Sequence, residues 1–204
     1  MPDRGLRRVA VIIPLMCLFG AQALASGDAE RPSGEERSIQ VYLHPQEALA
    51  KLFPHAEAFI REAHFISEEL RTRTQKCLGQ RFADDSLAVY IAASADHSLL
   101  GYAVMGEEIG KYRPITYAVA MTPGFRVTGA AILVYRESRG SEVRRSRFLR
   151  QYVGKDLSDP IRINRDIVNI SGATLSVRAL NFGVRKTLAL TEQIYTARDR
   201  AAAP

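Results

Sequence analysis

PITYAVAMTPGFRVTGAAILVY, residues 114–135, holds two short apolar runs on either side of a turn sequence. The runs at 114–121 and 127–135 are rich in Val, Ile, Tyr and Ala, and Pro123-Gly124 between them is typical of a tight turn. The pattern therefore predicts an antiparallel hairpin. Apolar residues fall on both faces of each run, so we expect helices to cover both faces of the sheet.

Two similar runs, at 87–94 and 99–106, precede this hairpin and extend the prediction to a four-stranded antiparallel meander. Residues 41–80 instead show apolar residues at steps of three, four and seven, which predicts a helical N-terminal segment. Pro54 is expected to divide that segment into two helices. The fold class that follows is α+β, an antiparallel sheet covered by helices.

A last helix is predicted from about Ser176. One apolar stripe runs along it, formed by Val177, Leu180, Val184 and Leu188. Such a stripe is typical of a helix that packs on a sheet or on other helices.

The turn before this helix reads Ser171-Gly172-Ala173-Thr174. Gly172 and Ala173 let a ligand approach the backbone closely, and the following helix directs N–H groups and its positive dipole end at the turn. Ser171, Thr174 and Ser176 add hydroxyl groups that donate to phosphate oxygens or cap the helix. The residues alone leave two interpretations open, a plain helix cap and a phosphate site.

ISGATLS and the amphipathic helix after it resemble the signature of the FMN-binding domain family. That family includes the C subunit of the sodium-translocating NADH:quinone reductase and the G subunit of the Rnf electron-transport complex. Upstream, the strands run into a Glu-Ser-Arg-Gly loop at 137–140, and FLRQYVGK at 148–155 is similar to the family's Phe–Gln–Gly-Lys segment. The resemblance covers roughly residues 99–195.

The resemblance implies an FMN cofactor whose phosphate is esterified to Thr174 by a separate flavin transferase that uses FAD as donor. On this basis residues 81–204 are expected to form the FMN-binding domain, with the flavin at the turn into the C-terminal helix. The implied cofactor-binding residues are Thr174, Ser171, Gly172, Ala173, Leu175, Ser176, Glu137, Ser138 and Gly140.

One position departs from the family pattern. The transferase motif has an aspartate three residues before the serine, and Val168 stands there in this chain. Asn169 is one residue off that position, and Asp166 is two residues too early.

The function that the resemblance favours is an exported flavoprotein that acts in electron transfer. Thr174 is then an anchor and no catalytic residue is assigned, so a redox carrier or subunit is favoured over a stand-alone enzyme. Its redox partner is not identified by the sequence, and a membrane-associated protein is one option. Two alternatives stay open: a flavin-dependent reductase with its own small substrate, and a flavin-free binding module of the same fold.

Residues 1–25 have the layout of a secretory signal peptide. A basic start at Arg4, Arg7 and Arg8 is followed by an uncharged apolar run and by Ala23-Leu24-Ala25. We expect cleavage after Ala25, a flexible lead-in at 26–40, and a periplasmic or otherwise exported protein. An uncleaved membrane anchor is the alternative, disfavoured by the short apolar run.

The chain carries a formal charge of +6, which suits an acidic partner or a phosphate ligand. Nucleic acid is not expected, because an exported protein does not meet it and no stacking motif is present. The cluster Arg144, Arg145, Arg147 and Arg150 is either a solvated helix face or a docking patch for an acidic redox partner. The histidines show no metal-ligand spacing, so no metal is assigned.

Overall fold

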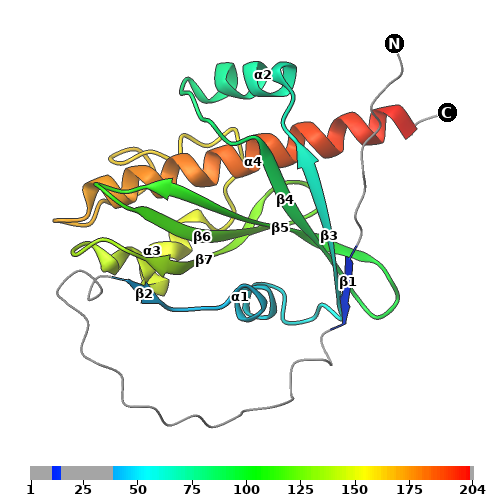
Figure 1. Cartoon of the computed structure of the whole chain (residues 1–204), viewed down its shortest axis with the longest axis horizontal. Helices are drawn as coiled ribbons and strands as arrows, with labels where there is room; N and C mark the ends of the chain where they lie inside the picture. Colours follow the sequence, from blue (N-terminus) through cyan, green and yellow to red (C-terminus); the bar gives the residue numbers. More distant parts are fainter. Residues whose placement is uncertain (1–10, 15–38, 203–204) are drawn as a thin grey trace, which may run out of the picture.

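The computed structural model describes residues 11–14 and 39–202 (Figure 1). Seven strands form one antiparallel sheet in the order β1-β3-β4-β5-β6-β7-β2. The strands are β1 (Val11–Pro14), β2 (Gln40–Val41), β3 (Ala58–Phe65), β4 (Ser86–Ala93), β5 (Leu99–Ile109), β6 (Pro114–Met121) and β7 (Val127–Tyr135). The helices are α1 (Pro45–Leu52), α2 (Glu68–Leu78), α3 (Ser146–Leu149) and α4 (Thr174–Ala202), with 3-10 helices η3 (Ser141–Arg144) and η4 (Arg150–Tyr152).

The four runs that the sequence marks as strands form β4 to β7, and consecutive strands pair as a meander. The tight turn between β6 and β7 is present as well, because the Phe125 N–H donates to the Thr122 carbonyl at 3.0 Å. The predicted hairpin and the α+β class are therefore confirmed.

The prediction of a helical segment over residues 41–80 is wrong in its middle. α1 and α2 lie there, but β3 separates them and pairs with β4 over its full length, from Ala58 opposite Ala93 to Phe65 opposite Ser86. Ala, Glu and Arg in this stretch favour a helix locally, and the pairing with β4 overrides that preference.

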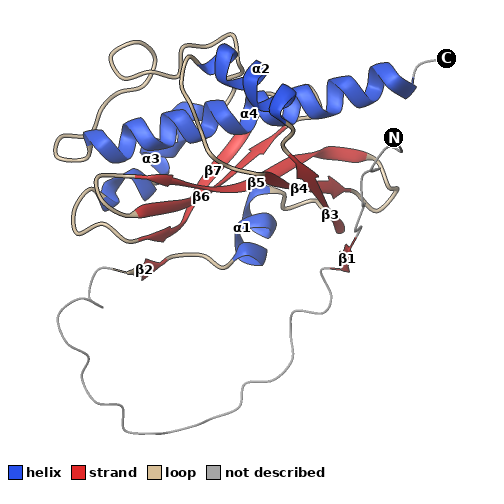
Figure 2. Cartoon of the chain, turned by 45° about the horizontal axis from the view of Figure 1, so that its top comes forward, coloured by secondary structure: helices blue, strands red, loops and turns tan. Residues whose placement is uncertain are grey.

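The two faces of the sheet are covered by different helices (Figure 2). On β6, Tyr117 and Val119 face α4 and join the main core, whereas Ala118 and Ala120 face the side of α1. Alanines on that second face leave room for α1 to approach. Continuous apolar runs thus serve a sheet that is buried on both sides, as the sequence predicts.

Helix α4 begins two residues earlier than expected, at Thr174. Its predicted apolar stripe is buried: Val177, Leu180, Val184 and Leu188 are each at most 2% exposed. α2 lies on the outer side of α4 (Figure 1). Among the described residues, no helix has the length and apolar character needed to cross a membrane.

The predicted signal peptide, 1–25, and lead-in, 26–40, lie mostly outside the described residues. The exceptions are Val11–Pro14, which form β1 against β3 with Val11 opposite Arg61, and residues 39–40, where β2 starts. Cleavage after Ala25 stays a prediction, and cleavage there would remove β1 and leave β3 as an edge strand.

Candidate functional site

The turn into α4 is set by a left-handed glycine. Gly172 has φ 78°, and Ala173 donates its N–H to the Ile170 carbonyl at 3.0 Å. Ser171 and Gly172 are exposed, whereas Ala173 is buried. A Cβ at Gly172 would meet open space, so it is the backbone conformation that favours glycine here.

Thr174 is the first residue of α4 and is partly exposed. Its Oγ1 accepts a hydrogen bond of 2.9 Å from Asn169 Nδ2. The helix has 29 residues, so its unpaired N–H groups and positive dipole end converge on this threonine. Leu175 beside it is 43% exposed.

Ser176 faces inward and is 4% exposed. Its Oγ lies 2.9 Å from the hydroxyl of Tyr135, which also donates to the Arg139 carbonyl at 2.6 Å. Burial raises the pKa of Tyr135, so this phenol stays neutral and available as a donor. Ser176 therefore fastens the start of α4 to the end of β7.

The 137–140 loop lies directly beside the SGAT turn. A Cβ placed on Gly140, which has φ 89°, would come within 3.2 Å of both Ala173 Cβ and Ser176 Oγ. Gly140 is thus required by a close approach to α4. Ser138 in the same loop is exposed. The structure brings the two predicted segments together, although 30 residues separate Gly140 from Ile170 in the sequence.

Glu137 is buried and links the 137–140 loop to the β5–β6 turn through hydrogen bonds. It is 8% exposed, and its Oε1 accepts the N–H groups of Tyr112 at 2.5 Å and Arg113 at 2.9 Å. Burial raises the pKa of Glu137, but the hydrogen bonds from the backbone of Arg113, Tyr112 and Lys111 outweigh it, and the pKa lies below its ordinary value. Glu137 holds the β5–β6 turn and is not a solvated loop acid.

The segment that resembles the family's Phe–Gln–Gly-Lys pattern braces the chain upstream of SGAT. Gln151 Oε1 accepts the Val168 N–H at 2.7 Å, and Lys155 forms a 2.9 Å ion pair with Asp166. Asp166 also accepts the N–H groups of Ile161 and Arg162. Asp166 is thereby occupied in its own loop.

The side chains of Val168 and Asn169 lie in different environments, one exposed to solvent and one in contact with Thr174. Val168 is 74% exposed. Asn169 contacts Thr174, and its Oδ1 is buried with no hydrogen-bond partner. Sequence reasoning did not select Asn169 as a site residue, although its position next to the expected aspartate was a signal.

Two cavities flank the turn. The larger cavity, about 640 Å³, is lined by the outer face of α4 at Leu175, Arg178 and Arg185, and by Ile109 and Arg162. Three cationic side chains and two exposed apolar side chains make the lining of this cavity partly charged and partly apolar. Arg185 donates to the Leu78 carbonyl, while its Nε is buried with no partner.

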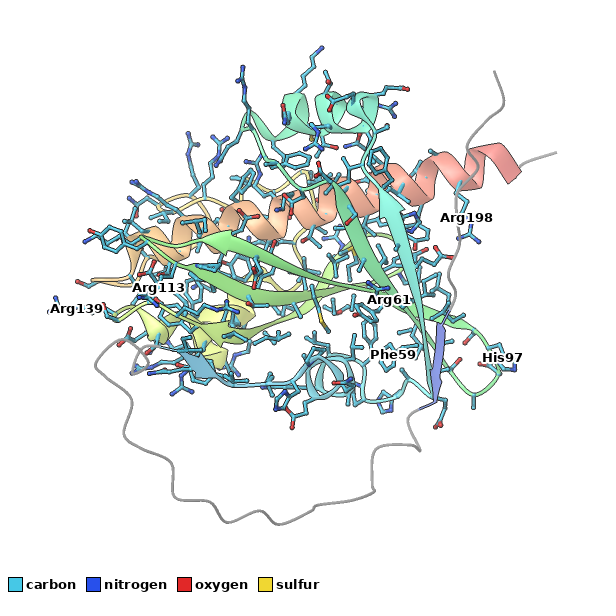
Figure 3. All side chains as sticks on the ribbon, in the orientation of Figure 1. Phe59, Arg61, His97, Arg113, Arg139 and Arg198 are labelled. Atoms are coloured by element: carbon cyan, nitrogen blue, oxygen red, sulfur yellow. The ribbon has the colours of Figure 1, made fainter. Side chains whose placement is uncertain are left out.

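The smaller cavity, about 470 Å³, is lined by residues upstream of the turn. Val168, Asn169 and Ile170 line it from one side, and Arg145 and Arg147 of the predicted basic patch line it from the other. All four arginines of that patch are exposed. Arg113 and Arg139 lie at this same end of the molecule (Figure 3).

Comparison with known proteins gives a family for this region. The model of the FMN-binding domain matches residues 110–189, from the β5–β6 turn to the middle of α4. Among solved structures, the chain is similar to NqrC of Shewanella oneidensis, with 16% identity and a TM-score of 0.45 over 66% of this chain and 69% of that one. The comparison with curated proteins found no match. Residues 110–189 therefore match an FMN-binding domain, and this match indicates FMN as the cofactor.

Proposed function

We propose that this chain is an exported electron carrier whose FMN is joined to Thr174 Oγ1 through a phosphoester. The observation that carries the proposal is the position of Thr174: a partly exposed hydroxyl at the start of a 29-residue helix, inside the residues that match the FMN-binding domain. A phosphate at this point meets unpaired helix N–H groups and the positive dipole end.

The residues around Thr174 fit the other parts of FMN. Exposed Leu175 and Ile109 offer apolar contacts for a planar ring, and the unpartnered Arg185 Nε offers a donor in the same cavity. FMN supplies the group that accepts and donates electrons. We assign the phosphate to Ser171, Gly172 and Thr174, and the opposite wall to the 137–140 loop.

The surrounding residues keep this site rigid. The Tyr135–Ser176 bond fixes the first turn of α4, and Glu137 holds the β5–β6 turn against the loop. Gln151 holds the backbone at Val168. Thr174 is thus presented by a framework of hydrogen bonds from three separate segments, and a tethered cofactor would keep a defined position.

The acid groups favour a carrier over a reductase. The carboxylate of Glu137 is committed to backbone N–H groups and is a poor proton donor. Of the side chains that line the larger cavity, the acidic one is Glu108, which forms a 2.6 Å ion pair with Lys186. Burial raises the pKa of Glu108, and Lys186 opposes that effect. In the alternative reductase, Glu108 would be the proton donor.

The test is co-expression with a flavin transferase, followed by the intact mass of the denatured protein. We expect a gain of one FMN minus one water, lost in Thr174→Val, which keeps the shape but removes the hydroxyl. Thr72→Val, the same change at an exposed position on α2, should retain the gain. The same mass shows whether residues 1–25 have been removed. An unchanged mass with active transferase rules out the phosphoester, and a mass that still contains residues 1–25 argues against signal cleavage.

A further inference from the structure

Asn169 makes the side-chain contact through which the chain upstream of SGAT reaches Thr174. Its Nδ2 lies 2.9 Å from Thr174 Oγ1. The backbone of the preceding residue is held in place, since Gln151 accepts the Val168 N–H at 2.7 Å and donates to the Val168 carbonyl at 3.5 Å. The amide is therefore aimed at the threonine from a fixed base.

The direction of this hydrogen bond matters chemically. A hydroxyl has one proton to donate and two lone pairs to accept with. Because Thr174 accepts from Asn169, the hydroxyl proton stays free to leave and a second lone pair stays free to form a bond. An ester oxygen at the same place can still accept, so the contact with Asn169 survives esterification.

We propose that Asn169 is the positioning residue that presents Thr174 Oγ1 for phosphoester formation; the inference rests on the proposed function. In that reaction Oγ1 forms a bond to the flavin-side phosphorus of FAD. The pyrophosphate bond breaks, AMP leaves, and the hydroxyl proton passes to a base of the transferase. No oxidation state changes. Asn169 takes no part in the bond changes and holds the attacking oxygen.

The buried Oδ1 of Asn169 supports a role beyond packing. A buried amide oxygen without a partner costs free energy, and such a group is rarely kept without a purpose. Val168 does not serve instead, since it is 74% exposed and Gln151 holds its backbone. The hydrogen bond to Thr174 therefore comes from the next residue along the chain.

The experiment measures the rate of FMN mass gain at limiting transferase and FAD. We expect Asn169→Ala to slow it roughly five- to tenfold, the equivalent of one lost hydrogen bond. Asn169→Asp keeps the shape but removes the donor and places a negative charge beside the phosphate, so it should be slower still. Gln46→Glu, the same amide-to-acid change at an exposed position on α1, should match wild type.

If Asn169→Ala lowers the melting temperature, the rate of FMN mass gain in Asn169→Asp decides the test instead. Wild-type rates in both Asn169 variants would overturn the inference and leave the anchor at Thr174 intact. So would rescue of Asn169→Ala by Val168→Asp, which would show that a carboxylate is read by the transferase instead. A wild-type chain that gains no mass overturns both the inference and the proposed phosphoester.

Discussion

The buried carboxylate of Glu137 accepts hydrogen bonds from the protein backbone. Two backbone N–H groups from the β5–β6 turn reach its Oε1, and the side chain lies almost completely out of solvent. Its lowered pKa means that the native state favours the ionised form more than the unfolded chain does. The acid is therefore a stabilising group with a defined pH range.

We expect Glu137→Gln to remove that pH dependence. A lowered native pKa gives stability that is present above the unfolded pKa and is lost as the pH falls through the native one. The gap in melting temperature between wild type and Glu137→Gln should be largest near pH 7 and should narrow in acid. Thermal melts from pH 7 to pH 3 measure it.

Glu57→Gln, at an exposed position, controls for the loss of one negative charge. A gap between wild type and Glu137→Gln that stays constant over the whole pH range would contradict the assignment. It would mean that the carboxylate is no more stabilised in the native protein than in the unfolded chain.

The sequence predicts some site residues better than others, for physical reasons. Thr174 lies in a local signal, small residues followed by an amphipathic stripe, so the sequence marks it as a candidate. A contact that holds the first turn of α4 comes from a distant segment, because Tyr135 reaches Ser176 across 41 residues. Such contacts depend on tertiary packing, which no local pattern encodes. Asn181 of α4 is likewise buried, and its Oδ1 accepts a hydrogen bond of 2.7 Å from the Tyr152 hydroxyl.

At the scale of secondary-structure elements, helix α4 contains Gly183 at an interior position where helix propensity favours alanine. Gly183 lies against Tyr117, and a Cβ there would come within 2.6 Å of the tyrosine ring and hydroxyl. Gly106 on β5 faces the same tyrosine in the same way. Glycines from a helix and a strand thus form the slot in which a fully buried tyrosine side chain lies.

We expect Gly183→Ala to lower the free energy of unfolding by up to about 2 kcal/mol. Overpacking a core costs roughly 1–3 kcal/mol, and better helix propensity returns about 1 kcal/mol. Urea denaturation measures the change. In a Tyr117→Leu background, where the ring is gone, the same substitution should become neutral or stabilising. If it stabilises the wild-type protein, the slot is not tightly packed.

Strand β3 shows why an element can be misread while its neighbours are predicted. Its sequence, AFIREAHF, contains good helix formers, and apolar residues do not alternate strictly. The hairpin of β6 and β7 instead carries its own turn and β-branched residues, so local and tertiary preferences agree there. Strand β3 depends on β4, which begins 21 residues after β3 ends.

At the scale of the whole molecule, positive charge gathers at the end that bears Thr174. Arg145 and Arg147 line the smaller cavity, and Arg162, Arg178 and Arg185 line the larger one. A field of one sign raises the rate at which oppositely charged partners arrive, and salt weakens it. This arrangement supports the interpretation of the arginine cluster as a docking patch for an acidic partner.

The double variant Arg145→Glu/Arg147→Glu should therefore slow oxidation of the reduced flavoprotein by ferricyanide, an anion, at low salt. We expect a drop of several-fold that disappears at high salt, and no drop with the cationic oxidant hexaammineruthenium. Stopped-flow absorbance follows the flavin. Lys51→Glu/Lys76→Glu, with the same change of net charge on α1 and α2, is the control. Equal effects in both double variants would exclude a local patch.

The length of α4 separates the two ends of the protein electronically. Its first residue is Thr174, and 21 residues later Tyr195 contacts His64 of β3 at 3.3 Å, so about 32 Å of helix lies between them. If FMN is attached at Thr174 as proposed, its electron would be far from any protein that docks along the outer edge of β3. Electrons would enter and leave the flavin at the same end of the protein, where Arg113 and Arg139 lie (Figure 3). The electron donor and the electron acceptor would then bind to the same surface, one after the other.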